Sequence, residues 1–272
     1  MKLIAISGLK GGVGASTVAA NLAGGLHDIN KNVAIVDLDF RNFLRVYFSM
    51  KMTDGDGWAS REYCGEDWAL AFHQSPAGVS FLPFGAQAKP VLSGREKSIS
   101  KQRKIDFYSD PKSVYRLSNS FFSEMLTTLA DQFDYAIIHL PSVSFTSSFM
   151  EPLRDLHATI DLHLVVINPD TACYSILDAQ GESVSQLSKI KLLANKFYST
   201  SEVSSDFSFY MKKIWGETLI SNPIHFDEAL AEATANLQTV GCYSPGSLAA
   251  AEFKTLALWS IAALSCDEGS YA

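Results

Sequence analysis

The sequence has few cysteines and no long apolar run, and both features exclude classes of protein. Its four cysteines are far apart and none belongs to a Cys-x-x-Cys motif, so we expect neither a metal cluster nor a disulfide framework. No apolar run approaches the roughly 20 residues of a membrane span. The first residues lack the charged and apolar regions of a signal peptide. We therefore expect a cytoplasmic protein.

An excess of positive charge is also missing, because the formal net charge is −7. This acidic balance argues against a protein that coats nucleic acid, and we expect no nucleic-acid partner. Residues 87–118 are an exception, with eight Lys or Arg against three Asp or Glu. This basic insertion is interpreted either as a solvated loop or as a docking patch for an acidic partner, anionic lipid or nucleic acid.

The pattern of apolar runs predicts the fold. The chain has 272 residues, 47% of them hydrophobic, which suits one α/β domain over residues 1–272. Continuous apolar strands that alternate with helical stretches are typical of a doubly wound, mostly parallel sheet, whose ligands bind at the carboxyl ends of the strands. The predicted strands are 3–6, 33–37, 79–83, 135–139, 162–167 and 190–194. The predicted helices include 16–29, 114–129 and 248–264, the last packed against the domain.

Residues 7–17 read SGLKGGVGAST and lie between the first predicted strand and the first predicted helix. The four glycines let the backbone approach an anion closely. Free N–H groups at the helix N-terminus point to the same place. A phosphate loop usually reads GxxxxGK[ST], but Ala15 stands where the lysine belongs. The stretch therefore predicts a nucleotide site that has lost one cation.

Hydroxyls and carboxylates surround this loop in the sequence. Ser16 is placed to ligate Mg²⁺ and Thr17 to bond a phosphate, although both could simply cap the helix. Asp37 ends the second predicted strand and Asp39 follows it, so both lie at the same edge of the sheet as the loop. They are interpreted either as site carboxylates or as a pair that caps the strand end.

The order Lys-Gly-Gly-x-Gly resembles the deviant Walker A motif of the MinD/ParA family, dimerising P-loop ATPases of the SIMIBI class. The resemblance implies that Lys10 reaches across a dimer interface to the partner's nucleotide. Ala15 replaces the lysine that contacts the β- and γ-phosphates in cis. By the same resemblance, Asp39 orients the attacking water and Asp37 lies near the Mg²⁺. Asn195 corresponds to the asparagine that reads the adenine edge.

A further motif departs from the family. The family has an apolar strand that ends in an aspartate, which holds Mg²⁺ through water, whereas this chain has His139 in Ile-Ile-His-Leu-Pro. An imidazole is a poor partner for a hard cation that prefers oxygen. We interpret His139 as a hydrogen-bonded histidine rather than as a metal ligand.

These observations give a set of predicted site residues. The catalytic candidate is Asp39, and the metal candidates are Ser16 and Asp37. The cofactors are ATP or ADP and Mg²⁺. The predicted nucleotide-binding residues are Gly8, Lys10, Gly11, Gly12, Val13, Gly14, Ala15, Ser16, Thr17 and Asn195.

Stretches elsewhere in the chain resemble the BcsQ (YhjQ) family, the MinD-like accessory proteins of bacterial cellulose secretion. The resemblance covers nearly the whole chain except the basic insertion. Members of that family tend to lack the cis lysine, whereas His139 and the insertion are departures. The stretches that carry the resemblance are 42–45, 57–59, 67–68, 82–85, 224–232, 240–241, 248–252 and 255–257.

The resemblance implies an ATP-dependent homodimer that assembles, localises or regulates the cellulose synthase complex. Its implied partners are a small BcsR-like protein and cytoplasmic parts of the synthase, which would recruit it to the inner membrane. Loss of a lysine and of a metal-shell carboxylate implies very slow hydrolysis, because phosphoryl transfer depends on positioned cations. The alternatives are an active positioning or partition ATPase and a pseudo-ATPase that binds partners with an empty site.

Overall fold

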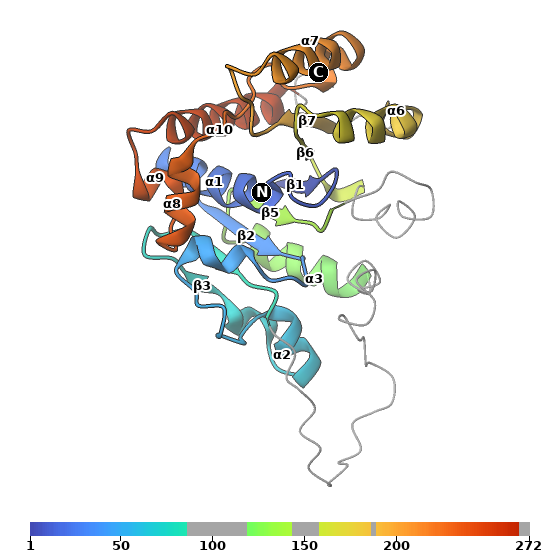
Figure 1. Ribbon diagram of the computed structural model, residues 1–272. Helices are drawn as coiled ribbons and strands as arrows, with labels where there is room; N and C mark the ends of the chain where they lie inside the picture. The colour runs from blue at the N-terminus through green and yellow to red at the C-terminus, as the bar shows by residue number, and fades with distance from the viewer. Residues whose placement is uncertain (86–118, 143–157, 186–188, 267–272) are drawn as a thin grey trace, which may run out of the picture.

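The computed structural model describes residues 1–85, 119–142, 158–185 and 189–266. Its strands form one seven-stranded sheet in the order β3-β4-β2-β5-β1-β6-β7 (Figure 1). Every pairing is parallel except that of β3 with β4. The predicted doubly wound fold is therefore confirmed. The strands are β1 (Lys2–Gly8), β2 (Val33–Asp37), β3 (His73–Gln74), β4 (Ser80–Leu82), β5 (Tyr135–His139), β6 (Leu162–Ile167) and β7 (Ile190–Ala194).

Helices surround this sheet. They are α1 (Ala15–Asp28), α2 (Trp58–Cys64), α3 (Asn119–Ala130), α6 (Thr171–Ser185), α7 (Glu202–Trp215), α8 (Glu228–Ala235), α9 (Val240–Tyr243) and α10 (Leu248–Cys266). Short 3₁₀ turns cover Leu44–Phe48, Trp68–Ala71 and Gly216–Thr218. The helix predicted over 114–129 is described from Asn119 onward, and the basic insertion at 87–118 lies outside the described residues.

The central strands are buried on both faces, which is why their sequences are continuously apolar. Side chains along a strand alternate between faces, and β1 divides its residues accordingly. Ile4 and Ile6 join the apolar cluster around α1 and α10. Leu3 and Ala5 join the cluster around α2 and α3. The sheet is thus the middle layer between two helical layers, as Figure 1 shows.

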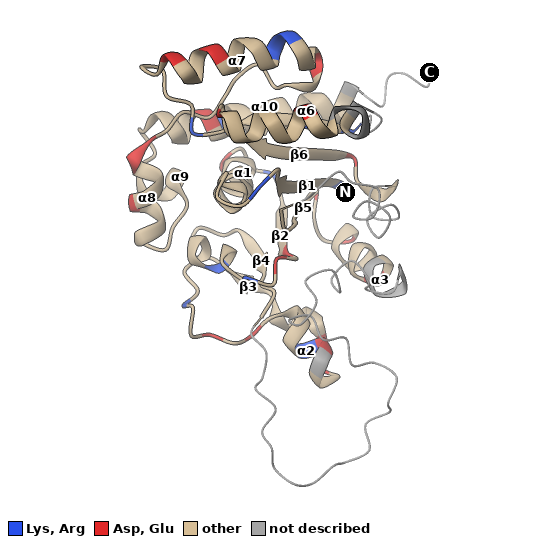
Figure 2. Ribbon diagram, turned by 45° about the vertical axis from the view of Figure 1, so that its right-hand side comes forward, with Lys and Arg blue, Asp and Glu red and all other residues tan. Residues whose placement is uncertain are grey.

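Helix α10 combines length with low polarity. Only Glu252 and Lys254 are charged in it, so it is drawn almost wholly tan in Figure 2. By length and composition it is long enough to span a membrane, which the sequence reading did not anticipate. Phe253 and Leu256 are nevertheless buried in the domain core. A Cβ on Gly25 of α1 would lie 2.8 Å from the carbonyl oxygen of Phe253. This close approach confirms the predicted packing of α10 on the domain.

Candidate functional site

The carboxyl ends of four parallel strands meet beside the glycine loop. Gly8 ends β1, Asp37 ends β2 and His139 ends β5, while Asn195 directly follows β7. The register pairs His139 with both Ile6 and Asp37. The parallel sheet therefore gathers residues that are far apart in the sequence at one edge, where the fold class places its ligands.

The conformation of the glycine loop is stabilised by a hydrogen bond from Asn195. Asn195 is 3% exposed and donates its side-chain amide to the carbonyl of Val13 at 2.8 Å. Gly14 precedes α1 with φ of 94°, in the left-handed region, and a Cβ there would lie 2.4 Å from Asn195 Nδ2. Only glycine fits this position without moving the asparagine. The predicted contact of Asn195 with adenine stays a prediction, because the structure shows its amide bonded to the loop.

Two lysines lie at the loop, and only Lys10 was predicted from the sequence. Lys10 is partly exposed and pairs with Asp170, with 3.5 Å between Nζ and Oδ2. Lys196 follows Asn195 and donates its ammonium group to the carbonyl of Gly12 at 2.8 Å. Lys196 adds a positive charge to a loop that lacks the lysine at position 15. Its place directly after a strand end was the available signal, because that position borders the ligand edge.

Ser16, His139 and Asp37 form a hydrogen-bonded row. Ser16 Oγ lies 3.2 Å from His139 Nε2, and His139 Nδ1 lies 2.8 Å from Asp37 Oδ1. His139 is 1% exposed. The hydrogen bonds expected of His139 are therefore present, whereas its absence from a metal site stays a prediction. Its partners, however, are the two residues predicted to serve the metal, a connection that no spacing in the sequence indicates.

Asp37 is the most deeply buried acid of the site. Burial raises the pKa of its carboxyl, and the hydrogen bond from His139 opposes that shift. Its Oδ1 accepts the backbone N–H of Asp39 at 2.9 Å, while Oδ2 has no hydrogen-bond partner in the structure. Burying a carboxylate oxygen without a hydrogen-bond partner costs free energy. Asp37 in this position therefore lowers the stability of the fold.

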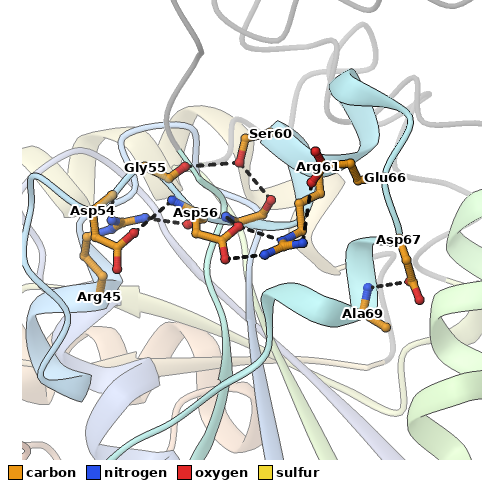
Figure 3. A network of polar contacts seen from close by, with 10 residues as sticks. Arg45, Asp54, Gly55, Asp56, Ser60, Arg61, Glu66, Asp67 and Ala69 are labelled. Carbon is orange, nitrogen blue, oxygen red and sulfur yellow. Dashed lines mark hydrogen bonds and ion pairs between the residues drawn. The ribbon is translucent and has the colours of Figure 1, made fainter.

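The backbone of Asp37 is fixed by α2. The indole Nε1 of Trp58, which is fully buried, donates to the Asp37 carbonyl at 2.7 Å. The chain before Trp58 is fixed by a polar network that Figure 3 shows. In it Arg45 donates to the carbonyl of Asp56 at 3.2 Å, and Arg61 forms two 2.7 Å bonds to the Asp56 carboxylate. The network holds the N-terminus of α2, and through Trp58 it supports the end of β2.

Asp39 and Thr17 are both engaged by neighbours in the same chain. The carboxylate of Asp39 is 2% exposed and takes a bidentate ion pair from Arg41, whose Nε lies 2.9 Å from Oδ2. Thr17 Oγ1 lies 2.8 Å from the hydroxyl of Tyr47. Burial raises the pKa of Tyr47. The predicted roles of Asp39 in orienting water and of Thr17 in bonding phosphate stay predictions. Arg41 competes for the Asp39 carboxylate, whereas the Thr17 hydroxyl can accept from Tyr47 and still donate to a phosphate.

The donors beside Ser16 differ from those of an oxygen-only Mg²⁺ site, and ligation of Mg²⁺ by Ser16 and Asp37 stays a prediction. Mg²⁺ takes oxygen ligands in a strict octahedron, and Ser16 supplies one oxygen. The ring of His139 stands between Ser16 and Asp37, so the next donor beside Ser16 is an imidazole nitrogen. The part of the chain that the structure describes contains no cluster of three His, Cys, Asp or Glu that could hold a metal ion.

Comparison with solved structures defines the class of protein. The cell division ATPase MinD from Pyrococcus furiosus has a TM-score of 0.67 and 22% identity, covering 94% of this chain and 97% of that chain. A cobyrinic acid a,c-diamide synthase from Mycobacterium smegmatis, solved with an ATP analog and magnesium, has a TM-score of 0.69 and 16% identity, covering 96% and 94%. The chain thus has the fold of the ParA and MinD ATPases.

Sequence comparison then gives the family. The family model described as cellulose biosynthesis protein BcsQ matches residues 1–261. The Escherichia coli protein of that name is 29% identical over 264 residues, which cover 96% of this chain and 94% of the relative. The chain belongs to the BcsQ family, as the motif resemblance predicts. The family is one of cellulose biosynthesis proteins.

Proposed function

We propose that the protein is an ATP-bound dimeric scaffold or slow switch that assembles, localises or regulates the cellulose synthase complex. One observation supports the proposal: the loop proposed to hold a nucleotide is well supported, whereas the groups proposed to cleave the nucleotide are replaced or engaged by neighbours. The loop is supported by Asn195 and Lys196. Ala15 has no amine, and Asp39 is bound by Arg41. Clamping a nucleotide needs the first set only, whereas turnover needs both.

The proposed partners follow from the family. They are a second copy of this chain, a small BcsR-like protein and cytoplasmic parts of the synthase. We propose a cytoplasmic protein that reaches the inner membrane through these partners, since α10 is packed into the domain. ATP is the proposed nucleotide, with ADP as the alternative state. We expect ATP to bind more tightly than GTP, because the family resemblance assigns Asn195 to the adenine edge.

A complementation experiment tests the scaffold function. Deletion of the gene should lower cellulose or related exopolysaccharide output in its host, and an Asp39→Asn variant should largely restore it. Asparagine keeps an Oδ1 acceptor for the backbone N–H of Arg41 but removes the charge needed to orient water. Output is measured by dye binding or by weighing the polymer. If Asp39→Asn folds and binds ATP yet behaves like the deletion, a hydrolysis-driven switch replaces the scaffold.

Lys10 gives a separate prediction about dimerisation. It is partly exposed beside the loop, and its ion pair with Asp170 is also partly exposed, so it can exchange that partner for a nucleotide held by a second copy. We expect Lys10→Ala to lower the dimer fraction at saturating ATP at least fivefold, without a change in the melting temperature of the monomer. Analytical ultracentrifugation with and without ATP is the measurement.

Lys196→Ala is the matched control for Lys10→Ala. Lys196 contacts the loop of its own chain, so its loss should weaken ATP binding but leave the dimer intact once ATP is saturating. An unchanged dimer fraction in Lys10→Ala would mean that Lys10 serves only its own loop and its ion pair with Asp170.

A further inference from the structure

The position of His139 has a consequence for the chemistry of the site. The ring is buried at the end of β5, next to the first turn of α1. Nδ1 faces Asp37 at 2.8 Å and Nε2 faces Ser16 at 3.2 Å. Ser16 directly follows the glycine loop, so Nε2 points to the place where a phosphate-bound cation would lie.

The hydrogen bonds fix which ring nitrogen is available. Asp37 Oδ1 already accepts the backbone N–H of Asp39, so it acts as an acceptor toward His139 as well. In the tautomer in which Nδ1 donates to Asp37, Nε2 carries the lone pair and faces Ser16. A histidine whose far nitrogen is held by a carboxylate is the usual arrangement of a metal-binding histidine, because the carboxylate orients the ring and raises its basicity.

The spacing also suits a shared metal ion. Two ligands that each lie about 2.1 Å from a metal, at a right angle, are about 3.0 Å apart. The observed 3.2 Å between Ser16 Oγ and His139 Nε2 is close to this value. For a cation to replace the hydrogen bond, the Ser16 hydroxyl would have to turn off the line along which the Nε2 lone pair points, while Asp37 would keep the ring in place from the side of Nδ1.

We propose that His139 Nε2 and Ser16 Oγ together ligate the divalent cation of a bound nucleotide, and that this site prefers a transition-metal ion over Mg²⁺. Imidazole suits metals such as Co²⁺ and Zn²⁺, whereas Mg²⁺ is selected by oxygen-only sites. The inference rests on the proposed nucleotide binding and adds the identity of the cation. The nucleotide would supply phosphate oxygens as further ligands.

Calorimetry of ATP binding tests this cation preference. Nucleotide-free protein is titrated with ATP in Mg²⁺, in Co²⁺ and in EDTA. We expect ATP to bind at least tenfold more tightly with Co²⁺ than with Mg²⁺, and more tightly with Mg²⁺ than in EDTA. Proton NMR of the Co²⁺–ATP complex should show paramagnetically shifted imidazole ring protons.

Two substitutions attribute the preference to His139. His139→Asp should reverse the order to favour Mg²⁺, because it restores an oxygen ligand. His139→Asn places an amide near the position of Nδ1, so it can keep the hydrogen bond to Asp37 but has no nitrogen that reaches Ser16, and it should abolish the preference even if the aspartate variant folds poorly. His27→Asn, at the far end of α1, should change neither the order nor the shifted resonances.

The remaining outcomes separate this inference from the proposed function. Equal affinity with Co²⁺ and Mg²⁺ would overturn the cation preference while leaving ATP binding in place. Equal affinity in all three conditions, EDTA included, would also overturn it and would mean that the ring merely fills the place of the cation. If ATP binds under none of the conditions, the proposed function fails and the inference fails with it.

Discussion

Gly14→Asp is expected to abolish nucleotide binding. At a φ of 94° an L-residue is strained, and the new Cβ would lie 2.4 Å from Asn195 Nδ2. The asparagine would have to leave the Val13 carbonyl, which removes the support of the loop. The added carboxylate would also repel the phosphates. We expect the dissociation constant for ATP to rise at least 100-fold, measured by calorimetry on protein whose fold is verified by circular dichroism.

A conservative glycine substitution serves as the control for Gly14→Asp. Gly246 lies in the connection before α10, and a Cβ there would meet no atom within 4 Å. Gly246→Ala should therefore bind ATP like the parent. In the host, Gly14→Asp should fail to restore exopolysaccharide output, unlike Asp39→Asn. Parental ATP affinity in Gly14→Asp would show that the nucleotide binds elsewhere.

The central sheet was predictable because its strands have a strong and simple signal. Strands β1, β2, β5, β6 and β7 are apolar at nearly every position, since helices cover both faces, and all were predicted within two residues of their ends. Strand β3 was missed because it has only two residues, His73 and Gln74, and neither is apolar. Its pairing depends on the turn that leads into β4 rather than on its own composition.

The site was predictable in its location but not in its contacts. Parallel strands bring their carboxyl ends to one edge, so Asp37 and His139 could be placed near Ser16 from the sequence. The insertion of the imidazole between the other two depends on side-chain rotamers, which periodicity does not encode. The same holds for Lys196, whose contact with Gly12 joins positions 184 residues apart.

The ion pair between Asp39 and Arg41 shows how family resemblance can mislead the prediction of a residue's role. They are two residues apart in a loop after β2, so their ion pair could have been proposed from the sequence. The resemblance to the MinD/ParA family instead directs attention to Asp39 as a free carboxylate. A local partner of opposite charge competes with that role, and the structure identifies this competitor.

Restoring the two altered groups should produce hydrolysis. Ala15→Lys with His139→Asp is expected to raise the rate of ATP hydrolysis in Mg²⁺ at least 100-fold over the parent. Ala15 is the first residue of α1, so a lysine there can reach back over the loop to the phosphates. His139→Asp returns an oxygen to the cation site. Each preorganised electrostatic group lowers the barrier by roughly 3 to 4 kcal/mol, so even partial recovery of both is enough for a 100-fold increase.

The single variants and a third substitution identify the limiting group. Phosphate release is measured at saturating ATP, and each single variant should recover less than the double. If the double variant binds ATP but hydrolyses it at the parental rate, the lysine and the cation site are not limiting. Asp39 would then be the defect, because Arg41 holds the carboxylate that must orient the water. Adding Arg41→Ala should release that carboxylate and raise the rate. If it does not, the loop cannot position the attacking water, and the fold serves as a clamp alone.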